Sequence, residues 1–161
     1  MVSGLSLLLS PFCFIFINGI DIIKTNFVKI AGINMLKKVD HKEHKLLALW
    51  AADCAEHVLH RFEDHYPQDD RPRKAIAAAR AWARNEMKMT EARKFALAAH
   101  AAARNAAEPE AIAAARAAGH AAATAHVPGH AKHAAAYAAK SAADPEIEKE
   151  WQRQKNPPSG S

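Results

Sequence analysis

Cysteine, glycine and aromatic residues are scarce in this chain of 161 residues. Its two cysteines, Cys13 and Cys54, are too few for a disulfide framework, and Cys54 is best interpreted as a small buried hydrophobic residue. The six glycines are scattered, so the sequence has no glycine-rich phosphate-binding loop. It also lacks the Gly-x-Ser-x-Gly, Cys-x-x-Cys and His-Glu-x-x-His motifs. We therefore expect neither an enzyme nor a bound cofactor.

The abundant residue is alanine, which dominates the chain from Ala48 onward. Alanine is the strongest helix former but carries little apolar area, so its helices form readily and each stabilises its neighbours only weakly. Glycine and proline fall mainly at the ends of the alanine-rich runs. The composition predicts an all-α fold, a compact bundle of about five to six closely packed helices, with no strand after residue 36.

Residues 1–34 have a different composition, rich in Ile, Phe and Asn. The apolar run from Val2 to Ile17 is interrupted by Pro11 and is shorter than the roughly 20 residues that a membrane span needs. No basic residue precedes this run and no small-x-small cleavage site follows it, which argues against a signal peptide. We interpret the segment as an extension upstream of a natural start at Met35, in a cytoplasmic protein without membrane contact. An N-terminal membrane anchor is the alternative.

The expected helical domain covers residues 35–146, and residues 147–161 are expected to form a short helix and a disordered polar tail. Turn-forming residues set the helix boundaries, with Asp70 predicted to cap the second helix and Thr90 the third. Helices are predicted over about 41–66, 71–84, 90–107, 108–127 and 130–143, and a sixth opens at the Asp-Pro-Glu of 144–146.

The first predicted helix has a core stripe and an opposite polar face. Asp53, His57, His60 and Asp64 follow one another on the polar face at i, i+4, i+7 and i+11, and their side chains are of types that bind metals. No other helix supplies a matching Glu-x-x-His, so a solvated polar face is the preferred interpretation and a metal site is the alternative. The core stripe consists of Leu47, Ala51, Cys54, Ala55, Val58 and Phe62.

Two sequence patterns recur at the same offset of 36 residues. AIAAAR occupies 75–80 and 111–116, while AAEPE at 106–110 returns as AADPE at 142–146. A unit of this length fits a helical hairpin, so one hypothesis is two tandem α-hairpin repeats after an N-terminal helix. Chance similarity between alanine-rich segments is the alternative.

Histidines interrupt the alanine-rich helices, as in AGHAAATAHVPGH at 118–130. Few side chains define the register of such helices, and hydrogen bonds from buried or half-buried imidazoles can do so. At the end of the fourth helix, His126 is placed to donate to unpaired carbonyls, whereas protonation is disfavoured for His130 and His133 at the start of the next. The sequence offers no other ligands that could converge on a metal with these histidines. We therefore interpret four of them as structural residues whose hydrogen bonds fix the helix packing: His57, His100, His120 and His126.

The formal net charge of +5 and the pI near 9.3 favour an acidic partner. Arginine suits bidentate pairing with carboxylates or phosphates. Acidic residues alternate with the basic ones and no aromatics lie between the arginines, which argues against nucleic acid. Candidate partner-binding residues gather on the second helix: Asp70, Arg71, Arg73, Arg80 and Arg84. The alternative is that these arginines pair inside the protein, with Asp53, Glu56, Glu63 and Asp64.

Four stretches carry a family resemblance: LALWAADCAEHVLHRFE, DDRPRKAIAAARAWAR, ARKFALAAHAAAR and ARAAGHAAATAHVPGHA. Over about residues 46–143 the chain resembles the immunity-five-like family of bacterial polymorphic toxin systems. The resemblance implies an all-α cytoplasmic protein that neutralises a cognate toxin; the alternative function is metal or ligand binding at the His/Asp-rich faces. Asn85 stands where the family often has glycine, so the resemblance does not define the backbone geometry of this turn. The residues that match the family pattern are Trp50, Asp53, Cys54, Glu56, His57, Arg71, Arg73, Arg80, Trp82, His100, Arg104, Gly119, His120 and His126.

Overall fold

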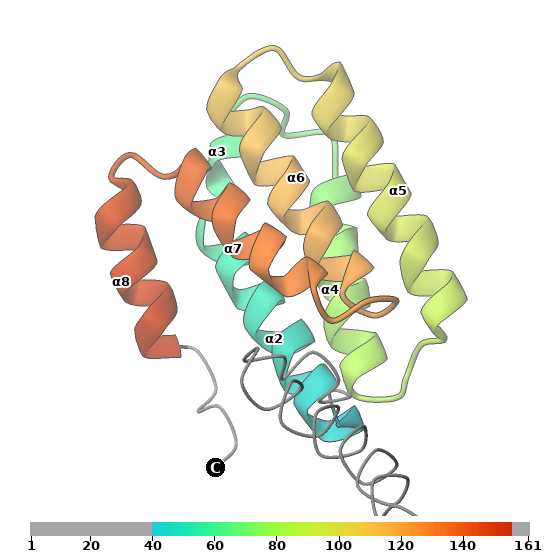
Figure 1. Cartoon of the computed structure of the whole chain (residues 1–161). Helices are drawn as coiled ribbons and strands as arrows, with labels where there is room; N and C mark the ends of the chain where they lie inside the picture. Colours follow the sequence, from blue (N-terminus) through green and yellow to red (C-terminus); the bar gives the residue numbers. More distant parts are fainter. Residues whose placement is uncertain (1–39, 156–161) are drawn as a thin grey trace, which may run out of the picture. The chain divides into compact units, whose positions relative to one another are not determined.

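The computed structural model describes residues 40–155, so the predictions for the segment 1–34, for the start at Met35 and for the last six residues lie outside the described part. Within the described range the fold is all-α, as predicted, and contains no strand (Figure 1). Its seven helices are α2 (His41–His57), α3 (His60–Glu63), α4 (Arg71–Ala83), α5 (Met89–Asn105), α6 (Pro109–Ala123), α7 (His130–Ser141) and α8 (Pro145–Lys155).

Helix α6 is the central element. It packs against α2, α3, α4, α5 and α7, and Figure 1 shows it between α5 and α7. Nine of its 15 residues are buried, which is typical of a helix that is apolar on nearly all sides. Its one partly exposed stripe consists of Ile112, Arg116, His120 and Ala123. The last helix, α8, packs on α7.

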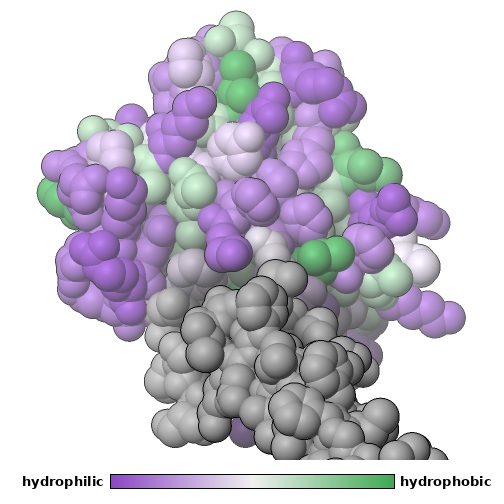
Figure 2. All heavy atoms as spheres, in the orientation of Figure 1, coloured by the Kyte–Doolittle hydropathy of each residue, from purple (hydrophilic) through white to green (hydrophobic). Residues whose placement is uncertain are grey.

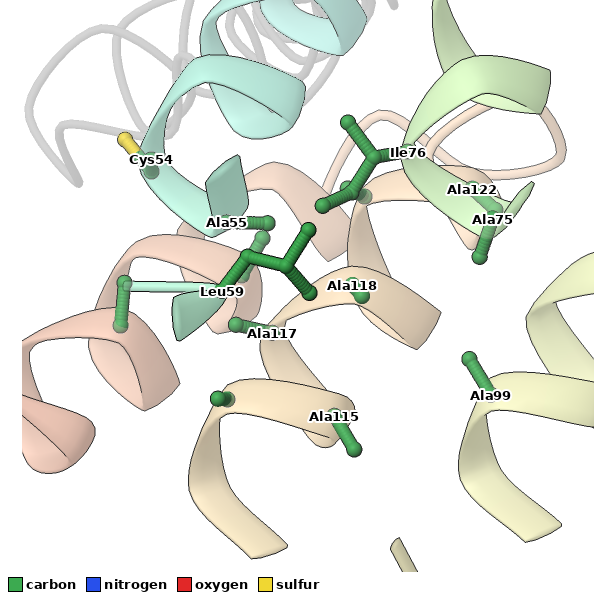
Figure 3. Packing of buried hydrophobic residues seen from close by; sticks show 14 of the residues in the cluster. Cys54, Ala55, Leu59, Ala75, Ile76, Ala99, Ala115, Ala117, Ala118 and Ala122 are labelled. Carbon is green, nitrogen blue, oxygen red and sulfur yellow. The ribbon is translucent and has the colours of Figure 1, made fainter. Parts of the chain in front are cut away.

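Alanine supplies most of the core. Ala55, Ala117 and Ala118 are fully buried where α2 meets α6, and Figure 3 shows how short their side chains are beside Leu59. Small side chains let helix backbones approach closely, so the energy comes from many short contacts rather than from a few large anchors. Phe62 is the largest of the fully buried side chains.

The prediction of one continuous helix over 41–66 is wrong. Helix α2 ends at His57, and Val58 and Leu59 form a turn before α3, which raises the number of helices to seven. Both turn residues are 2% exposed, although a continuous helix would point them about 100° apart. The break therefore lets two consecutive side chains enter the core, while the predicted stripe still buries Cys54, Val58 and Phe62.

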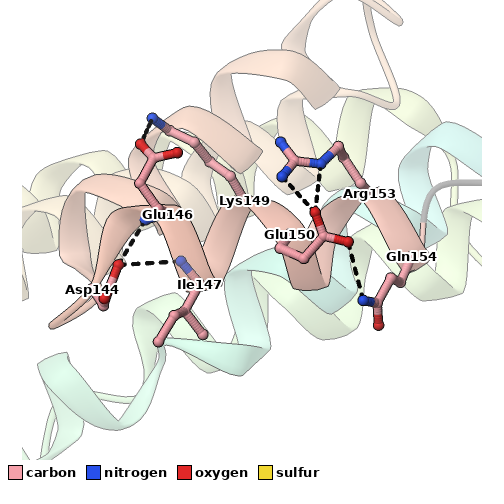
Figure 4. Close-up of polar contacts among 7 residues, drawn as sticks. All are labelled: Asp144, Glu146, Ile147, Lys149, Glu150, Arg153 and Gln154. Atoms are coloured by element: carbon pink, nitrogen blue, oxygen red, sulfur yellow. Dashed lines mark hydrogen bonds and ion pairs between the residues drawn. The ribbon is translucent and has the colours of Figure 1, made fainter.

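The helix starts differ in part from those predicted. Helix α5 begins at Met89 with Lys88 as its N-cap, so Thr90 is not the cap. Asp70 does occupy the N-cap position of α4, but its carboxylate pairs with Lys74 and makes no capping bond. The clear side-chain cap is on α8, where Asp144 Oδ1 accepts hydrogen bonds from the amides of residues 146 and 147, at 2.9 and 3.2 Å (Figure 4).

The turn after α4 keeps the left-handed geometry that glycine favours, with Asn85 at φ 64°. Asparagine tolerates this conformation better than most residues. The amide of Asn85 donates to the carbonyl of Trp82, and the amide of Glu86 donates to that of Ala81. These two bonds form a Schellman motif, so the replacement of glycine leaves the turn intact.

The repeated hexapeptide AIAAAR lies in α4 and again in α6, and these two helices pack against each other. Each is followed by a helix that packs on it, α5 on α4 and α7 on α6. The chain thus contains the two consecutive helical hairpins that the repeat suggests. Helix α2 packs against α4, α6 and α7, so the hairpins form a closed bundle rather than an open array.

Candidate functional site

The arginines predicted to bind a partner already have acidic partners inside the chain. Arg80 reaches Asp53 and Glu56 on α2 at 2.7 and 2.6 Å, and its guanidinium lowers the pKa of Glu56. Arg73 makes a bidentate pair with Glu63, at 2.7 and 2.6 Å. These are three of the internal pairs that the sequence offered as the alternative.

The other three members of the predicted set are paired locally. Arg84 makes a bidentate pair with Glu86, at 2.8 and 2.7 Å, and Arg71 donates to Asp69 at 2.8 Å. Asp70 accepts from a lysine one turn along α4, at 2.8 Å. Partner binding by this set of five residues stays a prediction. A partner that bound there would have to replace ion pairs that already exist within the chain.

The four residues of the alternative metal site are not brought together. Asp53 pairs with an arginine of α4, and His57 pairs with Glu148 of α8. The break after α2 places His60 and Asp64 on a separate short helical segment, where both are exposed. In residues 40–155 no cluster of three or more His, Cys, Asp or Glu side chains has the arrangement of a metal site.

His57 connects α2 to α8. Its Nδ1 donates to Glu148 Oε2 at 2.6 Å, and its ring stacks on Trp151 with a centroid separation of 4.0 Å. Glu148 is 3% exposed, and its other oxygen accepts from Gln152 at 2.9 Å.

Burial, followed by the nearby carboxylates, raises the pKa of the Cys54 thiol to about 12, so this thiol is not a nucleophile at neutral pH.

The ring of His126, exposed after the end of α6, makes no hydrogen bond within residues 40–155. His44 instead makes the bond to the end of α6 that was predicted for His126. His44 Nε2 donates to the carbonyl of Thr124, the C-cap residue of α6, and its ring lies 4.7 Å from that of Trp82. The sequence did not indicate this, because His44 is 80 residues from its acceptor.

Four imidazoles from three helices meet on the outer side of α6, and we call His100, His120, His130 and His133 the histidine cluster. The ring of His120 lies 4.9 Å from that of His100 on α5, and 5.3 Å from each of the two on α7. It also stacks on Tyr137 at 5.3 Å. His120 Nδ1 and His130 Nδ1 are 3.2 Å apart, so one donates and the other accepts as a neutral ring.

Gly119 makes room for this cluster. A methyl group at that position would lie 2.6 Å from Cε1 of His100, which is closer than carbon atoms approach without displacement. Glycine within a helix costs about 1 kcal/mol relative to alanine, so its presence among alanines marks a required close approach.

Burial and nearby positive charge disfavour protonation of three imidazoles in the histidine cluster, those of His100, His120 and His130. Burial, and then His100, His130 and other cationic neighbours, lower the pKa of His120 to about 4. Burial and the nearby Arg116 and Arg104 lower the pKa of His100. Burial and the adjacent His133 lower the pKa of His130, which agrees in direction with the prediction, although the stated cause was the helix end.

Residues 37–158 match the family described as "Imm-5 like putative immunity protein". The chain belongs to this family. The match extends over all seven helices and confirms the resemblance that the four sequence stretches suggested. No curated protein and no solved structure matches the chain.

As a member of an immunity family, the protein is expected to work by binding, which indicates a non-enzyme. The family-pattern residues do not form one site in the structure. Asp53, Glu56 and Arg80 join α2 to α4, whereas His100, Gly119 and His120 join α5 to α6. None of the described helices combines the length and apolar character that crossing a membrane requires.

Proposed function

We propose that this protein binds and neutralises a cognate bacterial toxin in the cytoplasm, as an immunity protein without enzymatic activity. The observation that carries the proposal is family membership over residues 37–158. A formal net charge of +5 supports a partner with an acidic binding surface, because like-charged surfaces repel on approach.

The distribution of charge within the fold supports the same partner. Six cationic side chains between residues 92 and 143 form no ion pair with any residue in the described range: Arg93, Lys94, Arg104, Arg116, Lys132 and Lys140. The two acidic residues of this segment, Glu108 and Glu110, lie near His65. A surface with unneutralised cations gains from a partner that supplies carboxylates.

The test is co-expression with any toxin candidate that the neighbouring genes encode, followed by affinity purification. The expected result is restored growth and a stoichiometric complex. Growth without a complex, or a complex that leaves the toxin fully active, would contradict neutralisation by binding.

A double variant tests the arginine row, which consists of Arg71, Arg73, Arg80 and Arg84. If the arginine row faces the toxin, Arg80→Glu combined with Arg84→Glu should weaken toxin binding, and more strongly at low salt. Circular dichroism separates this outcome from unfolding, which is expected if the pairs of Arg80 with the carboxylates of α2 are required for the fold. Full protection by a folded double variant places the interface elsewhere.

A further inference from the structure

A hollow lies between α6 and α7 beside the histidine cluster. It has a volume of about 280 Å³ and is lined by Pro109, Ile112, Ala113, Arg116, Tyr137 and Lys140. Tyr137 joins it to the cluster, because one face of the ring stacks on His120 while Arg116 lies 5.7 Å from the ring centroid. We call this hollow and the histidine cluster together the basic hollow. The face over α5, α6 and α7 is mostly hydrophilic in Figure 2.

The basic hollow collects positive and protonatable groups from each helix around it. α5 contributes His100 and Arg104, α6 contributes Arg116 and His120, and the loop after α6 carries His126. α7 contributes His130, His133, Tyr137 and Lys140. No Asp or Glu occurs between residues 111 and 143 or between 92 and 107.

This arrangement contrasts with the arginines of α4. Each of those faces a carboxylate of the same chain, so its charge is already neutralised. In the basic hollow, burial and nearby cationic groups instead lower the pKa of His100 and His120, because both disfavour protonated imidazole. A carboxylate brought into the hollow reverses that balance, since an opposite charge within a few ångströms favours protonated imidazole.

We propose that the basic hollow binds a carboxylate-bearing segment of the toxin, with Arg116 and Lys140 pairing with its carboxylates next to Tyr137 and His120. Proton uptake by His120 is then the expected consequence, because a nearby carboxylate favours protonated imidazole. This inference rests on the proposed function. Carboxylate is preferred over nucleic-acid phosphate because Tyr137 is the one aromatic side chain among the described lining residues, and His120 and Arg116 already contact its ring, so the hollow offers no row for base stacking.

The first experiment uses the full chain and a blocked hexaglutamate peptide as the probe, with inorganic phosphate and a single-stranded oligonucleotide as comparison ligands. Titration calorimetry in buffers of different ionisation enthalpy measures proton uptake. If one imidazole returns to its ordinary pKa in the complex, affinity rises about fourfold from pH 7.5 to pH 6.0. Binding without proton uptake, or tighter binding of phosphate or oligonucleotide than of hexaglutamate, overturns the inference.

The second experiment compares two charge reversals of equal size. Lys140→Glu removes an exposed cation from the hollow. Lys42→Glu removes an exposed cation of α2 that forms no ion pair with any residue of 40–155. We expect Lys140→Glu to weaken hexaglutamate binding about fivefold to tenfold at low salt, and Lys42→Glu to change it less than about twofold. Because Lys140 is exposed, the variant should fold even if Arg116→Glu does not. Equal effects of the two reversals would overturn the assigned surface.

Protection from the toxin separates this inference from the function on which it rests. If the wild type protects and Lys140→Glu protects equally well, the function stands and the surface is wrong. If the wild type neither protects nor binds the toxin, both are wrong.

Discussion

Acidification should destabilise this protein through the histidine cluster before most carboxylates titrate. The pKa of His120 falls from an ordinary value of 6.5 to about 4 in the folded protein. The folded state therefore binds fewer protons than the unfolded state between these two values. The stabilisation is fully present above about pH 6.5 and is lost as the pH falls toward 4.

The size of the effect follows from the same shift. At pH 5, a pKa of 6.5 in the unfolded chain against about 4 in the folded chain corresponds to about 2 kcal/mol. His120 is only partly buried, and solvent screening reduces this to about 1 kcal/mol. His100 and His130 add to the loss, because their pKa values are lowered as well.

The assay is urea unfolding of the wild type and of His120→Gln at pH 7.0, 6.0 and 5.0. The wild type should lose about 1 to 2 kcal/mol over this range, and His120→Gln should lose about 1 kcal/mol less, because glutamine does not titrate. The comparison cancels the carboxylates common to both proteins. Equal pH dependence in the two proteins would refute the reasoning, and so would a wild type that becomes more stable at pH 5.

Three further substitutions test the packing. Ala118→Leu should destabilise the fold by about 1–3 kcal/mol in thermal unfolding, because the core has no space for three more carbons, and an unchanged melting temperature would contradict close packing. Gly119→Ala should displace the ring of His100, which is measured as a shift of its NMR signals; unchanged signals would show that the contact is not formed. The same substitution should raise the intrinsic stability of the helix by about 1 kcal/mol, because alanine favours the helical conformation more than glycine does. Glu148→Ala should cost about 1–3 kcal/mol, because it removes the acceptor of His57 and of the buried Gln152 amide, whereas the exposed Glu150→Ala should stay within about 0.5 kcal/mol. Equal effects would mean that burial does not matter here.

Local chemistry and periodicity made much of the fold predictable. The alanine-rich segments formed helices close to the predicted boundaries, and the stripe containing Cys54 and Phe62 is buried. Charge complementarity also suggested the internal pairs of Arg80 and Arg73, because α2 and α3 precede α4 in the chain and carry the carboxylates that these arginines reach. The partner-binding use of the arginine row remains a prediction.

What the sequence by itself determined is therefore the set of elements: which segments are helical, which face of each is apolar, and that the chain is basic. Only the tertiary structure decided which distant side chains meet. The helix break at Val58 depends on what the core accepts, and His44 reaches α6 only because α2 packs across it. The histidine cluster exists because α5 and α7 flank the one partly exposed stripe of α6. Helix propensity and amphipathic period are local quantities, whereas these contacts depend on the order and angle in which alanine-faced helices stack, and many such stackings have similar energy.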